Sequence, residues 1–316
     1  MNNSTIHKKI RNAVYAAIIG DAVGVPYEFI PPDEMPDEII MKGKGVHNQP
    51  IGTWSDDSSM MLCIMKWLSI MHQKKRIFGN YSYEDYTELK RLWCDWYFKG
   101  YMTPFGKCFD IGNQTREALE ESTLYNPTTM YPSSQGNGAL MRILPFAFFV
   151  FSSSKLDGSD WSNKFLDVTE VMNNTSKITH GSIVSVKYCS LLLESLFNLS
   201  ARPGELTWAK LLMDEELPKD YVPKSSGWVV DTYYAAIYSA RKALDVKGSY
   251  ADKYKNAIIN AISLGNDTDT TAIITGGIMG MTLDKCLPDD WYNNIQNKEL
   301  IDSVIDEFCN EYFSKG

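Results

Sequence analysis

One short segment limits the fold more than any other, an apolar stretch headed by two carboxylates. Residues 264–280 read LGNDTDTTAIITGGIMG, so Asp267 and Asp269 stand among threonines before a run of isoleucine, glycine and methionine. A run this apolar is typical of a helix buried in a protein core. Neighbouring carboxylates at the start of such a helix repel each other unless a positive charge lies between them. The segment therefore predicts an enclosed helix with a cation at its start.

A second acidic cluster has the same form near the other end of the chain. Residues 53–62 read TWSDDSSMML, so Ser55, Asp56 and Asp57 precede an apolar helical run. Four carboxylates with Ser and Thr hydroxyls form an all-oxygen donor set, which suits Mg²⁺ or Mn²⁺ and not zinc or copper. Two such helix starts can bracket a pair of ions, the usual arrangement in two-metal hydrolysis.

Helix capping is the alternative explanation of each cluster taken alone. Ser and Asp are favoured at helix N-caps, and negative charge is stabilising near a helix N-terminus. Capping accounts for one or two residues of each cluster, but not for a carboxylate pair that is repeated at two apolar helices. The repetition favours the metal-binding interpretation.

Apolar residues recur at intervals of three and four along most of the chain, which is the period of α-helices. The pattern predicts helices over residues 7–22, 57–71, 83–99, 113–121, 138–151, 162–175, 181–199, 229–244, 251–264, 268–281 and 299–313. Alternating strand patterns and hairpin signals are missing. We therefore predict an all-α fold, with residues 1–316 forming a single domain.

Charge and cysteine content narrow the class of protein. The formal net charge is −8 and the sequence pI is about 5.1, so we expect no nucleic-acid partner, because nucleic-acid binding needs a basic surface. The six cysteines form no C-x-x-C pair and have mostly apolar or aromatic neighbours, which indicates reduced thiols in a cytoplasmic protein. No window holds 18 consecutive apolar residues, and Asp21 interrupts the apolar run near the N-terminus, so neither a membrane span nor a signal peptide is predicted.

Two further segments bring polar residues or glycines into the predicted core. In residues 18–29, Asp21 interrupts an apolar helix, and Glu28 stands before a proline- and glycine-rich loop over residues 30–54. We expect Asp21 to hydrogen-bond within the bundle, with support of the metal ligands from behind as the alternative. We expect Glu28 to reach toward a bound substrate. A Gly-Asn-Gly sequence at 136–138 precedes an apolar helix, where it is either an ordinary helix-initiating turn or an anion-binding site made of backbone N–H groups.

Six short blocks follow one another along the chain: GDAVGVPYEF, GTWSDDSSM, DIGNQTREAL, QGNGALMRILP, ITHGS and NDTDTTAIITGGIMG. Their sequences and their order resemble the ADP-ribosylglycohydrolase family, whose members include dinitrogenase reductase-activating glycohydrolases and ADP-ribosylarginine hydrolases. The resemblance extends from about Ile10 to Met281, nearly the whole chain. It implies an all-α, compact single-domain orthogonal helical bundle with two Mg²⁺ or Mn²⁺ ions in a central cleft.

The family's functional residues correspond to positions in all six blocks. The resemblance implies metal ligation by Ser55, Asp56, Asp57, Asp267, Asp269 and Thr270. It implies acid or base roles for Glu28 and for Asp110, which lies in the DIGN block. It implies contact with ADP-ribose for Gly136, Asn137, Gly138 and His180. Ser55 replaces the family's usual threonine, and its hydroxyl can still ligate a cation.

Several of these residues also have purely structural interpretations. Asp110 alone would be a turn residue or N-cap ahead of the next helix, and His180 alone would be a core or cap histidine. Gln135 stands where some family members carry an aromatic residue that can stack on the substrate, so the details of substrate recognition differ here. His47 and His72 are expected on the surface.

The predicted reaction is metal-dependent hydrolysis of the glycosidic bond between ADP-ribose and a modified side chain, with an oxocarbenium-like transition state. Arginine is the first choice of leaving group, because the block FDIGNQTREAL is similar to the arginine-type members. The expected partner is then an ADP-ribosylated protein, whose mono-ADP-ribosylation is reversed. The alternatives are another ADP-ribosyl linkage (serine, nucleobase or small molecule), a metal-dependent phosphoester hydrolase, and a weak or silent ADP-ribose-binding protein that neutralises a toxin.

Overall fold

Helices dominate the computed structural model, which describes residues 2–76, 78, 80–121, 133–155, 160–201 and 206–313. These ranges hold thirteen α-helices: α1 (Asn3–Gly24), α2 (Asp56–Gln73), α3 (Tyr83–Lys99), α4 (Asn113–Glu120), α5 (Leu144–Ala147), α6 (Asp160–Lys177), α7 (Ile183–Ala201), α8 (Leu206–Glu216), α9 (Val229–Leu244), α10 (Tyr250–Ile262), α11 (Thr268–Thr282), α12 (Asp289–Tyr292) and α13 (Lys298–Phe313). They also hold four 3₁₀-helices: η1 (Val25–Tyr27), η2 (Pro32–Glu34), η3 (Leu140–Arg142) and η4 (Phe148–Lys155). The same ranges contain two isolated β-bridges and no strand, so the prediction of an all-α fold is confirmed.

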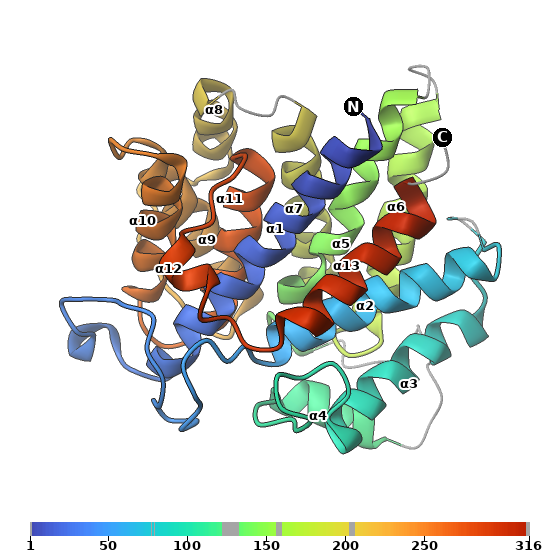
Figure 1. Ribbon diagram of the computed structural model, residues 1–316, viewed down its shortest axis with the longest axis horizontal. Coiled ribbons are helices and arrows are strands. Elements are labelled where there is room, and N and C mark those ends of the chain that lie inside the picture. Colours follow the sequence, from blue (N-terminus) through green and yellow to red (C-terminus); the bar gives the residue numbers. More distant parts are fainter. Residues whose placement is uncertain are drawn as a thin grey trace.

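α1 and α11 form the centre of the fold and pack backbone against backbone in antiparallel directions (Figure 1). A Cβ at Gly24 would lie 2.5 Å from Asp269 Cα, and a Cβ at Gly280 would lie 2.7 Å from a Cα of α1. Gly20 and Gly276 face the backbone of the opposite helix in the same way. Because carbon atoms in ordinary contact are about 3.5–4.0 Å apart, only glycine lets the two helices come this close.

The other helices cover both sides of this central pair (Figure 1). α9 and α10 pack against α11 on one side, and α13 packs against α1 and α2 on the other. α3 lies along α2, and α7 contacts both α6 and α9. Their buried apolar side chains form one connected cluster. Every residue of α11 is buried as a result, which is the enclosure that its apolar sequence predicts.

The predicted helix at 138–151 is wrong, because the chain there is divided into η3, α5 and η4. Pro145 lies inside this range and has no N–H to donate, so it occupies the first turn of α5 instead of continuing a longer helix. α8 and α12 are additional to the predicted set. The other predicted helices are present, and the largest shift of an end is at α1, which begins four residues before position 7.

Among the described residues, one helix passes a simple test for a membrane span. The window Ile183–Ser200 in α7 has a mean hydropathy of 1.2 over 18 residues, and 50% of it is buried inside the structure. α7 packs against α5, α6, α9 and α11. Core helices pass the same test, and these contacts are those of a core helix.

Candidate functional site

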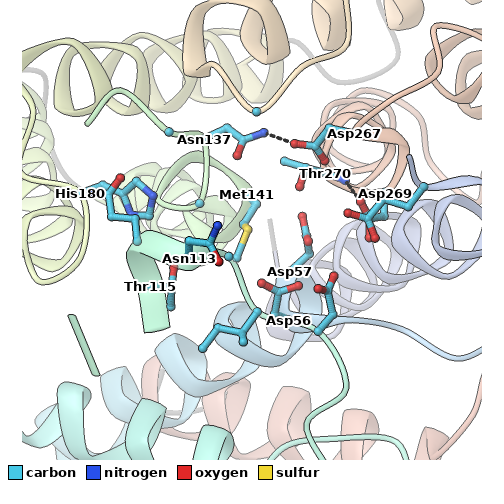
Figure 2. A pocket seen from close by; sticks show the side chains of 18 of the residues that line it. Asp56, Asp57, Asn113, Thr115, Asn137, Met141, His180, Asp267, Asp269 and Thr270 are labelled. Atoms are coloured by element: carbon cyan, nitrogen blue, oxygen red, sulfur yellow. Dashed lines mark hydrogen bonds between the residues drawn. The ribbon is translucent and has the colours of Figure 1, made fainter. Parts of the chain in front are cut away.

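The starts of α2 and α11 meet at one cleft, which brings the two acidic clusters together (Figure 2). Asp56 and Asp57 lie in the first turn of α2, while Asp267 is the N-cap of α11 and Asp269 lies in its first turn. Asp57 and Asp269 are almost completely buried, at 2% and 1% exposure. Each helix N-terminus carries a partial positive charge, which offsets part of the repulsion among the carboxylates. The cleft thus concentrates four carboxylates from opposite ends of the chain.

A fifth carboxylate, Asp21 of α1, fixes the start of α2. Its oxygens accept hydrogen bonds from the backbone N–H groups of Ser55 (3.0 Å) and Ser58 (3.1 Å), and from the Ser58 hydroxyl. Burial raises the pKa of Asp21 to about 6, although these hydrogen bonds lower it. The Ser55 hydroxyl completes the cap, since it lies 3.3 Å from the Asp57 backbone nitrogen and donates to Asp57 Oδ2 at 3.2 Å. Asp21 therefore hydrogen-bonds within the bundle, as expected, and positions the acidic first turn of α2.

Hydrogen bonds from several parts of the chain hold the start of α11, among them one from the Ser225 hydroxyl to the Asp267 carbonyl at 2.7 Å. Asp267 Oδ2 accepts a hydrogen bond from Asn137 Nδ2 at 2.7 Å, and Asp269 Oδ1 accepts one from the Thr270 backbone N–H at 2.9 Å. The Thr268 hydroxyl donates to a backbone carbonyl at the end of α1, also at 2.9 Å. These bonds use one carboxylate oxygen of each aspartate and leave the other for the cleft.

The cleft is strongly acidic, since neither arginine nor lysine is among the described residues that line it. Burial raises the pKa of Asp56, Asp57 and Asp269 well above the usual value, and the neighbouring carboxylates raise it further. Within the described part of the chain, the buried oxygens Asp57 Oδ1 and Asp269 Oδ2 have no hydrogen-bond partner. A buried carboxylate oxygen without a donor is unfavourable, and a bound cation would supply the missing partner.

The donor atoms of this cluster fit a hard divalent cation. Carboxylate oxygens of Glu28, Asp267 and Asp269 lie within 4.8 Å of one another, and Thr270 lines the same cleft. Carboxylate and hydroxyl oxygens are ligands that Mg²⁺ and Mn²⁺ prefer, whereas copper and zinc favour nitrogen and sulfur. Asp269 Oδ2, one of the two oxygens without partners, belongs to this group, and Asp57, which carries the other, lines the same cleft. The site can therefore hold divalent cations of this class.

Glu28 lies at the cleft beside His47, a residue that the sequence analysis expected on the surface. His47 Nε2 hydrogen-bonds to Glu28 Oε2 and lies 3.8 Å from Asp110 Oδ2. The expectation that His47 is a surface residue is wrong, because its side chain is only 12% exposed and its ring packs near Phe29 and Phe109. Burial raises the pKa of Glu28 to about 7; the His47 hydrogen bond lowers it, and neighbouring carboxylates raise it.

The loop over residues 28–54, which carries Glu28 and His47, is attached to the bundle at both ends. The Phe29 N–H donates to the Asn266 carbonyl at 2.7 Å, and the Asn266 N–H donates at the same distance to the carbonyl of the residue after Phe29. At the other end, the Trp54 indole donates to a backbone carbonyl before α13 at 3.0 Å. Phe29 has a φ of +65°, which is strained for a bulky residue and is held here by these bonds.

Gly136, Asn137 and Gly138 line the cleft together with His180. Figure 2 shows Asn137 and His180 at this wall. A Cβ at Gly138 would lie 2.8 Å from His180 Cε1, so glycine lets the imidazole pack directly on the backbone. The Asn137 N–H donates to the Gly227 carbonyl at 3.1 Å and is not free for an anion. The element that follows, η3, has only three residues, so no long helix begins here.

The cleft has a volume of about 610 Å³, within the range of sites for small ligands and cofactors. All the predicted site residues but one line it: Glu28, Asp56, Asp57, Asp110, Gly136, Asn137, Gly138, His180, Asp267, Asp269 and Thr270. The exception is Ser55, which is 1% exposed and whose hydroxyl is engaged with Asp57.

Other residues that the sequence did not single out also line the cleft. They include Phe29, Asn113, Gln114, Thr115, Met141, Gly227 and Asn266. Three of them, Asn113, Gln114 and Thr115, lie in the block DIGNQTREAL at the start of α4, so the block itself was a signal for them. Met141 sits in the block after the Gly-Asn-Gly sequence. Gly227 lies outside all six blocks, and nothing in the local pattern marks it.

Comparison with known proteins decides the family. A sequence model of the ADP-ribosylglycohydrolase family matches residues 2–316. The chain belongs to the ADP-ribosylglycohydrolase family. It is therefore a hydrolase, and the resemblance seen in the six blocks is confirmed.

Relatives of this glycohydrolase cover nearly all of its length. The ADP-ribosylarginine hydrolase Tri1 of Serratia proteamaculans is 28% identical, over 95% of this chain and 78% of its own. The Tri1 of Pseudomonas putida is 29% identical over 95% and 77%. The ADP-ribosyl-dinitrogen reductase glycohydrolase of Rhodospirillum rubrum is 23% identical, over 94% of each chain. A solved structure, an ADP-ribosylglycohydrolase-related protein complex, shares the fold with a TM-score of 0.72 at 20% identity, over 97% of this chain and 99% of that one.

Proposed function

We propose that this glycohydrolase removes ADP-ribose from arginine side chains of modified proteins, using two Mg²⁺ or Mn²⁺ ions. The observation that carries the proposal is the cluster of four carboxylates, three of them buried, with two unpartnered oxygens, in a cleft of about 610 Å³. Arginine is supported by the two relatives named ADP-ribosylarginine hydrolases, which align over 95% of the chain.

The metal ligands in this proposal are the residues that already face one another across the helix starts. These are Asp56, Asp57, Asp267, Asp269 and Thr270. Ser55 acts by capping α2 and holding Asp57, because its hydroxyl is engaged there. When bound, divalent cations orient ribose hydroxyls and make a water molecule more acidic.

Glu28 and Asp110 are the proposed proton-handling groups. His47 engages Oε2 of Glu28, which leaves Oε1 for the cleft, and the same imidazole lies 3.8 Å from Asp110 Oδ2. One histidine thus holds both carboxylates at the same side of the cleft. General acid–base catalysis of this kind contributes about 10²–10⁴-fold to a rate.

Release of ADP-ribose from a mono-ADP-ribosyl-arginine peptide tests the proposal. The assay compares Mg²⁺ with EDTA, and wild type with Asp267→Ala. Asp290→Asn is the matched control, because its carboxylate is 63% exposed and pairs with Lys255 away from the cleft. We expect release by wild type and the control in Mg²⁺, and a loss of more than about 10²-fold in EDTA or in Asp267→Ala.

One other substrate, a binding measurement and the EDTA comparison separate the alternatives. Release from a seryl-linked peptide but not from the arginyl one would replace the proposed linkage. Tight ADP-ribose binding without release from either peptide would indicate a binding protein. Release that is unchanged in EDTA would contradict the metal-dependent mechanism.

A further inference from the structure

A chain of buried hydrogen bonds runs behind the wall of the cleft that carries His180. Arg142 Nη2 donates to the Thr179 hydroxyl oxygen at 2.7 Å, and that oxygen lies 2.8 Å from His180 Nδ1. Arg142 is 1% exposed, Thr179 is 0% exposed and His180 is 3% exposed. A guanidinium buried in the core is unusual, so this arrangement calls for a specific explanation.

Nothing in the packing of Arg142 neutralises its charge. Its guanidinium lies 4.0 Å from the centroid of the Trp93 ring, and Nη1 contacts Met60 Sδ at 3.5 Å. Among the described residues, no carboxylate forms an ion pair with it. Burial lowers the pKa of Arg142 to about 9, so the group remains a cation at neutral pH. Arginine has only donors, whichever partner it meets.

The direction of each hydrogen bond in this series follows from counting the available hydrogens. The Thr179 oxygen accepts from Arg142, and its own single hydrogen is left to be donated. His180 Nδ1 is the one acceptor that the structure places within reach of that hydrogen in the described part of the chain. Nδ1 therefore accepts, and a neutral imidazole with an unprotonated Nδ1 carries its proton on Nε2.

The other protonation states of His180 do not fit. If Nδ1 carried the proton, the Thr179 oxygen would receive two donors and its hydrogen would have no acceptor, which is costly for a buried hydroxyl. A doubly protonated ring would meet the same conflict. Burial lowers the pKa of His180 to about 3, and the nearby Arg142 charge lowers it further. The neutral Nε2–H form is the one that satisfies every group.

Thr179 also fixes a second side chain at the same wall, through its backbone. Gln114 Nε2 donates to the Thr179 carbonyl at 2.6 Å. Gln114 Oε1 is then turned away from that carbonyl, and it is buried without a partner in the described part of the chain. A Cβ at Gly136 would lie 3.1 Å from His180 Nε2 and 3.4 Å from Gln114 Oε1. The two atoms therefore face the same glycine of the cleft wall.

We propose that Arg142 and Thr179 are positioning residues that set the hydrogen-bond polarity of this wall. Through them His180 presents an uncharged N–H donor from Nε2 at the cleft wall, while Oε1 of Gln114 is buried beside it. A neutral N–H donor matches an acceptor oxygen of the ligand, such as that of a hydroxyl or a phosphate. The inference deepens the proposed function, but its first test needs neither substrate nor metal.

Nitrogen NMR of ¹⁵N-histidine-labelled protein tests the inference directly. The chain has four histidines, and His180→Gln assigns the signal in question. We expect Nδ1 of His180 to show the chemical shift of an unprotonated nitrogen and Nε2 that of a protonated one. This should hold at every pH above about 5 at which the protein is folded. A protonated Nδ1 in the wild-type protein would overturn the proposal.

Matched variants at one position separate positioning from packing. Thr179→Ser keeps the hydroxyl and should keep the Nε2–H form, whereas Thr179→Val has nearly the same volume and should yield a mixture of the two neutral forms. If the valine variant does not fold, Thr179→Ser and Arg142→Met still provide the comparison. A pure Nε2–H form in both Thr179→Val and Arg142→Met would overturn the role assigned to them.

Binding of ADP-ribose, measured by calorimetry, connects the polarity to the ligand. Thr179→Val should weaken binding about fivefold to tenfold, the effect of one neutral hydrogen bond, and Thr179→Ser by less than about twofold. If the wild-type protein does not bind ADP-ribose, the proposed function fails, while the NMR result still stands. If binding is strong but unaffected in Thr179→Val, the link between this wall and the ligand fails.

Discussion

Replacing Gly24 with alanine should damage the acidic site through the backbone alone. The added Cβ would lie 2.5 Å from Asp269 Cα and 2.7 Å from the Asp269 backbone nitrogen. Ordinary contact between such atoms is about 3.5–4.0 Å. α1 and α11 must therefore move apart by about 1 Å at this level, which carries Asp269 away from the carboxylates of α2.

The structure sets the size of two effects of Gly24→Ala, the loss of stability and the loss of activity. Overpacking of this kind costs about 1–3 kcal/mol of stability, and the better helix propensity of alanine offsets up to about 1 kcal/mol of it. A displacement of about 1 Å in a catalytic site can lower the rate on the order of 10²-fold. Gly24→Ala should thus lose little stability and much activity.

Gly280→Ala is the matched control on the same pair of helices. Its Cβ would lie 2.7 Å from Ala13 Cα, so the clash is of the same kind. Gly280 is 11 positions beyond Asp269 in α11, roughly 16 Å along the axis at about 1.5 Å per residue. We expect a comparable loss of stability with activity reduced by less than about threefold.

The assay combines urea unfolding with ADP-ribose release and Mg²⁺ titration, at a temperature where both variants are folded. Gly24→Ala should need more Mg²⁺ for half-maximal activity than Gly280→Ala. The reasoning is refuted if the two variants lose the same share of activity. It is equally refuted if Gly24→Ala keeps the wild-type Mg²⁺ requirement.

Three further predictions concern buried carboxylates. Because burial raises the pKa of Glu28 to about 7, the metal-free fold binds more protons than the unfolded chain and loses stability as the pH rises from about 4 to 7. The gain in melting temperature on replacing EDTA by Mg²⁺ should therefore grow from about pH 5 to pH 8, and a constant gain would contradict this. Asp269→Asn should raise the melting temperature in EDTA, since it removes a buried charge with an unpartnered oxygen, and should abolish the gain from Mg²⁺. Asp21→Asn should lower the unfolding free energy by about 2–4 kcal/mol in urea titrations, because an amide nitrogen cannot accept hydrogen bonds from the N–H groups of Ser55 and Ser58. The surface variant Asp290→Asn should change the unfolding free energy by less than about 0.5 kcal/mol.

Much of the helical framework could be predicted from sequence, because its signals are local. Short segments contain both signals. These are the three- and four-residue spacing of apolar residues and the acidic N-terminal turns of α2 and α11. The helix expected at 138–151 failed for a local reason as well. Pro145 breaks the backbone ladder in the middle of an otherwise periodic run, and that signal outweighs the spacing.

The parts of the site that sequence reasoning missed depend on contacts between distant segments. His47 lies in a loop without periodicity, and only the folded loop brings its ring beside Glu28. Gln114 has an ordinary position in a helix, and its orientation is set by the carbonyl of Thr179. Ser55 differs from the other predicted ligands, because its hydroxyl donates to Asp57 and it is not among the residues that line the cleft.

The close packing of α1 against α11 also determines when α1 can be buried during synthesis of the chain. Gly24 and Asp269 are 245 positions apart (269 − 24), so the first helix to be synthesised waits for one of the last. At about 5–20 residues per second, α1 spends roughly 12–50 seconds without the partner that covers it. Residues 10–24 of α1 are almost all buried in the finished protein, so an apolar helix is left exposed for that time. Apolar surface exposed for that long favours aggregation, so truncation before α11 should leave the chain insoluble.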